Sequence, residues 1–566
     1  MNKKKWKKIL KVSLIVLLII IIIPLLLITA LELYTMYMPA MNPIQYDAQV
    51  ADYSPTQEWK FSTPEEQGMD SEKLLEMVEE YQKANLKDEN IMIDSVTIVR
   101  NGYIVSEMYF NPLFPKETKH IIHSATKSVT SALIGIAIDK GYIENVDVPV
   151  MSFFEDKQIE NLDKRWNNLT LKHLLTMQTG LQSRDSYLYD YEKLDKMQKT
   201  DDWIRYVLNQ SFEVDPGTRF EYSNFASFLL GAILFETTGV DTLEFAKENL
   251  FIPLGIEDII WEKSPKGITK SWARMWLKPN DMAKIGQLYL QKGEWDGEQI
   301  ISSKWIDASL IAHSSPKKYR KIYDEDGKWD LMKSGGDWTI NFFSKPLVEG
   351  YGYQWWLGKS KIYSAVGAQG QYIIVAPEEN LIVVFTSKLP GMDEFYPIKL
   401  FDKFILPSVV SDEPLIVNED VHKKLALLSE PPELVLENGF VKNISDFAYE
   451  ISGKIYELGE NYFNYNNLKF EFEQDKGFAQ ISYEVKEGDF VSYQISLDDK
   501  YRFTESEGLT YASFGYWIDQ SSFVVETEVI GYSTKDKWTF TFEEDKIFVE
   551  ERGVVGIQNY EGEIKN

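Results

Sequence analysis

The chain of 566 residues contains no cysteine and only five histidines. The absence of cysteine excludes disulfide bonds, thiolate metal ligands, a cysteine nucleophile and a lipidated cysteine. A metal-dependent hydrolase would have to draw its ligands from a small supply, and we expect no metal and no organic cofactor. The five histidines are His120, His123, His173, His313 and His422.

Basic residues are scarce relative to acidic ones, 60 against 87, and the formal net charge is -27. Six of these basic residues are lysines within the first eleven positions, so the rest of the chain is still more acidic. An acidic surface repels phosphate backbones, and nucleic acid is not an expected partner. The hydrophobic fraction of 44% is typical of a globular protein, and the length indicates roughly two to four domains.

Residues 12–34 are predicted to form a transmembrane anchor. The run from Val12 to Leu31 has no charged residue, and as a helix it spans about 30 Å, the thickness of a bilayer core. A cleaved signal peptide is the alternative, but its apolar region is usually only about 7 to 15 residues long. Because cationic flanks stay inside, residues 1–11 are expected to be a basic cytoplasmic stub and the remainder to be extracytoplasmic.

Residues 35–60 carry prolines without clear periodicity, which indicates a tether. A mixed α/β domain is expected over residues 61–410. Within its first part, Glu65–Ala84 resembles a helix that starts at Thr63, and residues 91–110 resemble two strands joined at Asn101-Gly102.

Helical patterns dominate from residue 124 to about residue 310, and strand patterns return between Tyr363 and Thr386. The strands therefore come from both ends of a region that encloses helices, which predicts one sheet flanked by helices with an all-helical subregion. Residues 415–566 alternate short aromatic and β-branched runs with Gly, Asn and Asp turns. This pattern predicts a β-rich accessory domain, an antiparallel meander or a lipocalin-like barrel.

The segment His123-Ser124-Ala125-Thr126-Lys127 opens a predicted helix that ends near Lys140, before Gly141. Lys127 lies one turn after Ser124 on the same face, within reach of its hydroxyl. The positive helix end also favours an oxyanion at Ser124. An isolated S-x-x-K is common, and an N-cap serine with a solvated lysine is the alternative. His123 is not expected to act as a base, because adjacent residues at a helix start point in different directions.

A second pattern is Tyr222-Ser223-Asn224, which follows a Pro-Gly turn and precedes a long apolar helix. A phenol and an amine each have a reference pKa near 10, and placing them together lowers both. Either Tyr222 takes the serine proton while Lys127 stays cationic, or the two share this role. Asn224 offers an amide to the substrate or to Lys127, with a helix N-cap as the alternative.

The third pattern is Gly367-Ala368-Gln369-Gly370-Gln371, directly before an apolar strand. Glycines at such a place allow the backbone to approach a ligand closely. The backbone N–H of Gln371 is therefore a candidate second oxyanion donor beside that of Ser124. Taken alone, the pattern is also that of an ordinary turn.

In this order the three patterns resemble the serine β-lactamase and penicillin-binding-protein superfamily. The likeness extends to class C β-lactamases, D-alanyl-D-alanine carboxypeptidases, family VIII esterases and 6-aminohexanoate-dimer hydrolases, and it covers residues 60–405. Further matching stretches lie at 169–181, 277–286 and 351–356. The resemblance implies a β-lactamase-like α/β fold, Ser124 as nucleophile, and Lys127 and Tyr222 as acid and base. It also implies substrate and oxyanion contacts from three residues, Asn224, Gly370 and Gln371.

One departure bears on the substrate, since the family's K-T-G triad aligns with Ala368-Gln369-Gly370. The cation that often holds a substrate carboxylate is thus missing there, which favours small-molecule or peptide ester or amide substrates without a carboxylate at that place. The first alternative is a penicillin-binding D,D-peptidase that modifies cell wall. The second is a non-catalytic binding or sensor protein that keeps the fold without turnover.

Overall fold

The structure is a computed structural model that describes most of the chain from residue 44 onward. The described ranges are 44–47, 53–88, 91–114, 116–157, 159, 163–182, 192–316, 349–389, 391–432, 446–461, 464–472, 477–486, 488–497, 501–506, 509–532, 535–553 and 556–565. The predicted anchor at 12–34 lies outside them. Within these ranges no single helix has the length and apolarity to cross a membrane, although the bent pair Asn224–Thr238 and Thr242–Phe251 meets both criteria jointly.

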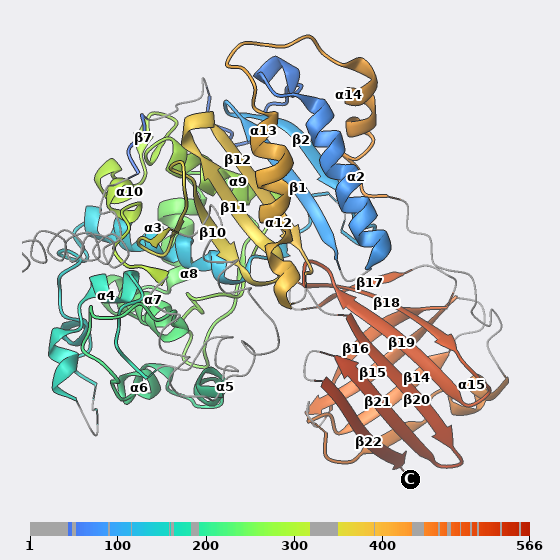
Figure 1. Ribbon diagram of the computed structural model, residues 1–566. Coiled ribbons are helices and arrows are strands. Elements are labelled where there is room, and N and C mark those ends of the chain that lie inside the picture. Colours follow the sequence, from blue (N-terminus) through green and yellow to red (C-terminus); the bar gives the residue numbers. More distant parts are fainter. Residues whose placement is uncertain are drawn as a thin grey trace, which may run out of the picture.

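A seven-stranded sheet forms the centre of the first domain (Figure 1), with the order β2-β1-β12-β11-β10-β9-β8. Its members are β1 (Ile93–Arg100), β2 (Tyr103–Tyr109), β8 (Gly350–Tyr351), β9 (Trp356–Leu357), β10 (Tyr363–Gly367), β11 (Gln371–Ala376) and β12 (Leu381–Ser387). The pairings are antiparallel, and β1 from the start of the domain pairs with β12 from its end. The prediction of one sheet built from both ends of the region is confirmed.

Helices cover both faces of this sheet. On one face, Ile373 and Val375 pack in a core that includes α9 (Pro279–Leu290), while Ile374 between them points into the core on the other face. That second core includes α2 (Ser71–Lys87), α12 (Tyr396–Leu400) and the turns after it, which lie in front of the sheet in Figure 1. Burial on both sides explains why β11 and β12 are uninterrupted apolar runs.

Two local predictions met different outcomes. Asn101 and Gly102 both have positive φ and form the turn between β1 and β2, as predicted. The predicted helix start at Thr63 is wrong for the long helix. Thr63 caps only the short 3-10 turn Glu65–Gln67, Gly68 ends that turn at φ 72°, and α2 begins after its own cap, Asp70.

The helical subregion is built around two buried helices, α3 (Thr126–Asp139) and α7 (Asn224–Thr238). Ser223 caps α7, and Gly239 ends it at φ 73°. Shorter helices surround this pair: α4 (Leu171–Leu175), α5 (Glu192–Gln198), α6 (Trp203–Leu208), α8 (Thr242–Ala246) and α10 (Ser303–Ser309). An apolar α7 that is buried on nearly all sides is the expected state for a helix without a polar face.

The C-terminal strands form a closed barrel. In chain order they are β13 (Ile455–Leu458), β14 (Asn467–Phe472), β15 (Phe478–Lys486), β16 (Asp489–Ser496), β17 (Arg502–Ser506), β18 (Leu509–Trp517), β19 (Ser522–Val529), β20 (Lys535–Glu543), β21 (Lys546–Gly553) and β22 (Gly556–Ile564). A parallel pairing of β16 with β18 closes the ring and leaves β17 as an added strand. The interior is aromatic, with Phe470, Phe523 and Phe540 at its centre. Of the two predicted forms, the barrel is the observed one.

Contacts at two places bear on where the first domain begins and ends. Helix α14 (Glu419–Ala426) packs on α2 of the first domain, so residues after 415 do not all belong to the barrel. The described part of the expected tether is not loose. Tyr46 donates a hydrogen bond to the carbonyl of Tyr289 at 2.5 Å, and Trp59 is buried.

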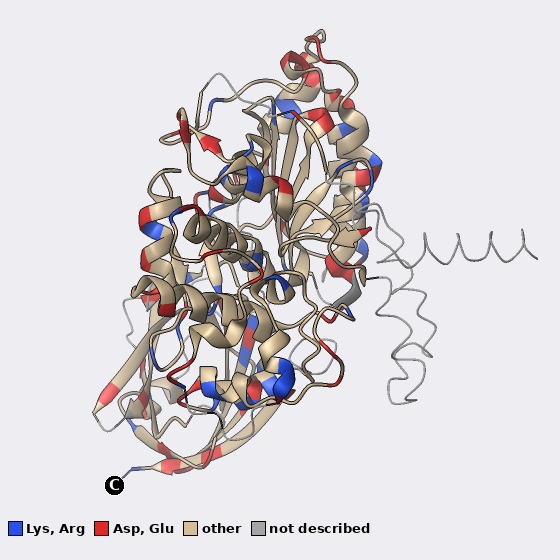
Figure 2. Cartoon of the chain, turned by 90° about the vertical axis from the view of Figure 1, so that its left-hand side faces the viewer, with Lys and Arg blue, Asp and Glu red and all other residues tan. Residues whose placement is uncertain are grey.

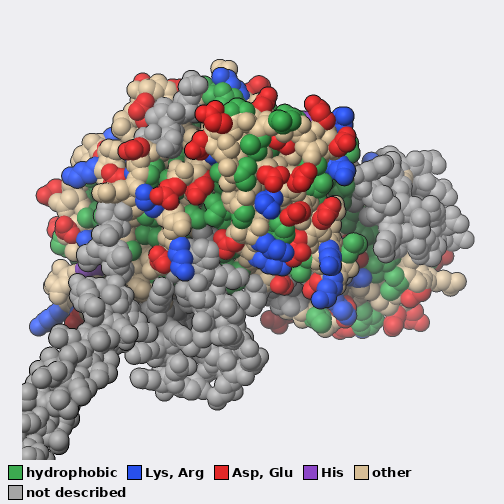
Figure 3. All heavy atoms as spheres, turned by 45° about the horizontal axis from the view of Figure 1, so that its top comes forward, with side chains coloured by type: hydrophobic (Ala, Val, Ile, Leu, Met, Phe, Trp, Pro, Cys, Tyr) green, Lys and Arg blue, Asp and Glu red, His purple; other side chains and the backbone are tan. Residues whose placement is uncertain are grey.

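Acidic and basic side chains are mixed over the surface of the described residues in both views. Figure 2 shows Lys and Arg interspersed with Asp and Glu along the helical side, and Figure 3 shows the same mixture over the top face. Surface ion pairs such as Lys119 with Asp258, at 2.6 Å, join neighbouring loops. On these two faces the pattern differs from the continuous basic stripe with which proteins bind nucleic acid.

Candidate active site

The nucleophile candidate lies at the end of a short strand. Strand β3 (His120–Ile121) pairs with β5 (Met275–Leu277) and leads into a 3-10 turn, His123–Ala125, which continues as α3. His123 has φ 45°, a left-handed conformation that turns the chain sharply into the helix. Ser124 is thereby partly exposed, whereas the residues that follow it in α3 are buried.

Lys127 is almost completely buried beneath Ser124, with an exposed fraction of 1%. Its Nζ donates to Ser124 Oγ at 3.1 Å, to Asn224 Oδ1 at 2.8 Å and to the carbonyl of Trp272 at 2.7 Å. The predicted spacing of one helical turn therefore brings hydroxyl and amine into hydrogen-bond contact.

Tyr222 and Asn224 reach the same point from the start of α7. Lys127 Nζ lies 4.8 Å from the centroid of the Tyr222 ring, which stacks on Trp356 with an angle of 22° between the rings. Asn224 is the first residue of α7, and Ser223 occupies the cap position, so the amide is directed to Lys127. Residues almost one hundred positions apart thus meet around one amine.

The glycine-rich turn lies against the backbone just before Ser124. A Cβ on Gly367 would come within 2.2 Å of the carbonyl oxygen of Ile122, so only glycine permits this approach. Gly370 has φ 86° and is buried against Leu389 and Ser387. The turn Ala368–Gly370 and the first residue of β11, Gln371, are consequently placed next to the nucleophile segment.

The side chain of Gln371 reaches the end of the neighbouring strand β12. Its Nε2 donates to the carbonyl of Ser387 at 2.6 Å, and its Oε1 accepts from the backbone N–H of the same residue at 3.3 Å. Any contribution of Gln371 to an oxyanion site would therefore come from its backbone. This is the contribution that the sequence predicts.

Two further residues lie beside the turn: Glu394, which was missed from the sequence, and His123, which was not expected to act as a base. Glu394 accepts a hydrogen bond from the backbone N–H of Gln369 at 3.2 Å, and burial raises its pKa to about 7. His123 Nε2 lies 2.9 Å from Gln369 Oε1, and burial, followed by the charge of Arg274, lowers the pKa of His123 to about 3. His123 is therefore a neutral neighbour of the turn.

A further missed residue joins the helices of the site. Gln354 is buried with φ 62°, and its Nε2 donates to the carbonyls of Leu174 and Leu175. Its Oε1 accepts from Ser227 of α7, and its carbonyl accepts from Ser128 of α3. One glutamine thus connects the helix that carries Lys127 to the helix that carries Asn224.

Two observations limit other kinds of site. Among the described residues, no group of three or more His, Cys, Asp or Glu side chains could hold a metal ion.

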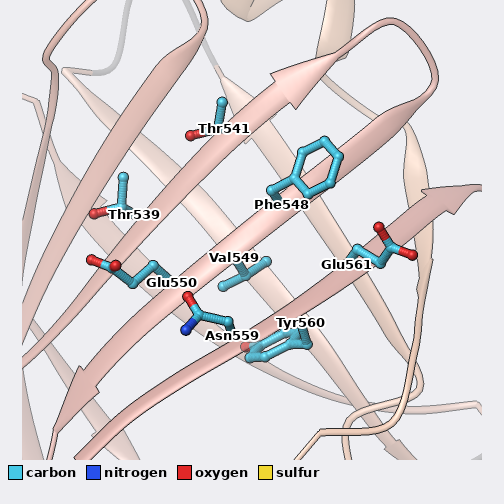
Figure 4. Close-up of a pocket in the computed structure, with 8 residues that line it drawn as sticks. All are labelled: Thr539, Thr541, Phe548, Val549, Glu550, Asn559, Tyr560 and Glu561. Atoms are coloured by element: carbon cyan, nitrogen blue, oxygen red, sulfur yellow. The ribbon is translucent and has the colours of Figure 1, made fainter.

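A groove of about 500 Å³ lies on strands β20 to β22 of the barrel (Figure 4), between residues such as Thr539, Phe548 and Tyr560. Neither Ser124 nor Lys127 lines it.

Comparison with known proteins gives one family. A family model described as Beta-lactamase matches residues 76–400. The 6-aminohexanoate-dimer hydrolase of Paenarthrobacter ureafaciens is 21% identical over 319 residues, which cover 54% of this chain and 75% of that protein. The monacolin J acid methylbutanoyltransferase of Aspergillus terreus is 27% identical over 263 residues, 42% of this chain and 59% of that protein.

Solved structures with a similar arrangement include an octameric penicillin-binding protein homologue from Pyrococcus abyssi. It is 17% identical, with a TM-score of 0.45, and the match covers 87% of this chain and all of that one. The matched family region, residues 76–400, contains Ser124, Lys127, Tyr222 and the glycine-rich turn.

Proposed function

The chain belongs to the beta-lactamase family of serine hydrolases, and on this premise we propose that it cleaves an ester or amide bond through an acyl-enzyme on Ser124. The observation that carries the proposal is the 3.1 Å contact between Lys127 Nζ and Ser124 Oγ. A serine hydroxyl is a weak nucleophile at its ordinary pKa and needs an adjacent base.

The contacts of Lys127 suit it for this role. Two of them are to oxygens that can only accept, Asn224 Oδ1 and the Trp272 carbonyl, so they orient N–H groups of the amine away from Ser124. When the amine is neutral, its lone pair can then face the serine hydroxyl and take its proton. When the amine is charged, it instead donates a hydrogen bond to Ser124 Oγ, as in the structure.

Tyr222 supplies the second titratable group, with its ring face on the Lys127 amine. In the proposed first step Ser124 Oγ bonds to the substrate carbonyl carbon, its proton passes to Lys127 or Tyr222, and that proton is returned to the leaving group as the ester or amide bond breaks. The backbone N–H groups of Ser124 and Gln371 would stabilise the oxyanion. Water then attacks the acyl-enzyme and releases the acid and the free hydroxyl.

The substrate class follows from the turn and from the relatives. Ala368-Gln369-Gly370 lacks the cation of the K-T-G triad. One relative is named as a 6-aminohexanoate-dimer hydrolase and another as a methylbutanoyltransferase. The proposed acyl-enzyme chemistry suits an ester or amide donor. Transfer of the acyl group to an alcohol in place of water is compatible with the same intermediate.

The location is also part of the proposal. The uncharged run within residues 12–34 and the six preceding lysines support a single-pass anchor with the catalytic domain outside the cytoplasm. Membrane fractionation and protease accessibility of whole cells test this, using a chain without residues 1–34 as the control. An intact chain recovered in the soluble fraction contradicts the anchor.

The catalytic proposal is tested with a fluorophosphonate probe and with short-chain 4-nitrophenyl esters. The wild type should be labelled and should hydrolyse the esters, and Ser124→Ala should do neither. Equal labelling of both proteins contradicts Ser124 as the nucleophile, and a folded wild type without labelling or turnover favours the sensor alternative. Labelled penicillin and D-alanyl peptides serve as the second substrate set, since a stable adduct and release of D-alanine would favour a D,D-peptidase.

A further inference from the structure

The barrel touches the segment that carries the nucleophile. The turn after β19 accepts a hydrogen bond from the backbone N–H of Ile121, at 2.7 Å, through the carbonyl of Gly531. Gly531 has φ 75°, and a Cβ there would lie 2.0 Å from the carbonyl oxygen of Lys119. The barrel turn therefore lies directly against β3, which ends three residues before Ser124.

Two further contacts fix this turn in place. Ile530 and Ala512 of the barrel form an apolar cluster with Tyr109, Leu113 and Phe114 of the first domain. Nearby, Glu528 of β19 forms a largely buried ion pair with Lys388, which follows β12. The position of the turn is thus set by apolar, charged and backbone contacts together. Figure 1 shows β18 and β19 of the barrel next to the first domain.

The barrel turn contacts Arg274 through Tyr532. The pairing of Ile121 with Trp276, and the bond from Ile122 N–H to the Met275 carbonyl, place Arg274 opposite His123 in the same register. Arg274 NH1 donates to the hydroxyl of Tyr532 at 2.7 Å, and its guanidinium lies 5.3 Å from the centroid of the Tyr532 ring. A barrel tyrosine therefore orients an arginine beside the residue that precedes the nucleophile.

The acidic side chain next to Arg274 is Glu262. Glu262 lies 2.7 Å from the amine of Lys270 and 3.7 Å from Arg274 Nε, so two cations share one carboxylate. His123, on the other side, is neutral because its pKa is about 3. The Arg274 side chain is 34% exposed, so part of it faces solvent.

We infer that Arg274, oriented by Tyr532 of the barrel, binds a carboxylate on the substrate of Ser124. A planar guanidinium binds a carboxylate with two parallel hydrogen bonds. The turn Ala368-Gln369-Gly370 lacks a cation, and Arg274 supplies one opposite His123, whose ring contacts Gln369 of that turn. This inference rests on the proposed function, and it makes the barrel a wall of the substrate site.

Matched ester pairs test the inference. On the acyl side, 4-nitrophenyl hydrogen glutarate is compared with 4-nitrophenyl pentanoate, and on the leaving-group side, 3-carboxyphenyl acetate with phenyl acetate. The wild type should prefer the anionic ester in the pair whose carboxylate lies on the side of the substrate that reaches Arg274. For that anionic ester, Arg274→Gln should lower kcat/KM at least about tenfold. Hydrolysis of the neutral partner should change less than about twofold. Arg274→Lys should restore part of the preference, and Tyr532→Phe should reduce it by about threefold.

Controls separate this inference from the proposed function and from a loss of folding. Arg552→Gln removes an exposed barrel arginine that contacts Glu550, and it should leave both kcat/KM values unchanged. If Arg274→Gln lowers kcat/KM equally for the anionic and the neutral ester, the role of Arg274 is structural and the inference is overturned. A wild type that does not prefer the anionic ester in either pair also overturns it. If no ester is turned over, protection of Ser124 from a fluorophosphonate by free glutarate decides. Protection in the wild type but not in Arg274→Gln supports the carboxylate site, and equal protection or none overturns it.

Discussion

The two walls of the site are built in different ways. One wall comes from α3 and α7, where Lys127, Tyr222 and Asn224 lie in short motifs and meet around one buried amine. The other comes from three distant segments, the glycine-rich turn, the start of β5 and the barrel turn at Tyr532. In the proposed mechanism the first wall holds the groups that move protons and the second holds groups that contact the substrate, so we expect substitutions in the first wall to affect rate and substitutions in the second to affect selectivity.

The largest expected effect lies in the first wall. Lys127→Met keeps an apolar stem of similar length and removes the amine, so kcat/KM for a neutral 4-nitrophenyl ester should fall about a thousandfold, within the range of general base catalysis. Steady-state kinetics measure it, and Lys399→Met, which removes a surface amine paired with Glu80, should have no effect. A loss of less than tenfold in a folded variant would remove Lys127 from the mechanism.

An intermediate effect is expected where the barrel meets β3. Gly531→Ala adds a Cβ 2.0 Å from a backbone oxygen, whereas Gly453→Ala, at φ 81°, meets no atom within 4 Å. Both variants carry the cost of a left-handed alanine, about 1 kcal/mol, and the clash at Gly531 should cost about 1 to 3 kcal/mol more. Urea unfolding measures the difference, and only Gly531→Ala should also lose preference for the anionic ester. Identical behaviour of the two variants contradicts a tight contact at β3.

The smallest expected effect compares two acids, Glu394, which is partly buried beside the turn, and Glu551, which is buried in the barrel. Burial raises the pKa of each from 4.5 to about 7. The folded state therefore holds these protons more tightly than the unfolded chain, and the stability they contribute is complete below about pH 4.5 and is lost as pH rises through about 7. Replacement by glutamine should stabilise either protein more at pH 8 than at pH 5.

Activity distinguishes these two acids. Only Glu394→Gln should shift the pH dependence of kcat/KM, because its carboxylate accepts from the backbone N–H of Gln369. Urea unfolding at both pH values and a pH–rate profile provide the measurements. A shifted profile for Glu551→Gln, or none for Glu394→Gln, would contradict the assignment.

Much of the fold could be predicted from local patterns. The Asn101-Gly102 turn, the two apolar strands before and after residues 377–380 and the alternating C-terminal strands each carry a short-range signal. The start of α2 could not be predicted correctly, because Thr63 and Asp70 are both good caps and only the left-handed Gly68 shows that two helices begin there. The packing of α14 and Tyr46 on the first domain depends on tertiary contacts that leave no local pattern.

The residues of the site also fall into two groups, those that the sequence predicts and those that it does not. The sequence predicts the meeting of Ser124, Lys127, Tyr222 and Asn224, because their residue types and spacing match a known family, and their proposed roles await the experiments above. The Trp272 carbonyl carries no residue-type signal, since any residue offers that oxygen. Arg274 and Tyr532 are 258 positions apart, and no local pattern indicates their contact.

The bond from Ile121 to Gly531 has a consequence for biosynthesis. A chain emerging from the ribosome presents Ser124 long before the last strands exist, and a bond between these two residues can form only after residue 531 has been made. We therefore expect nascent and truncated chains to carry an incomplete cleft, so that selective turnover begins only when translation has passed the barrel.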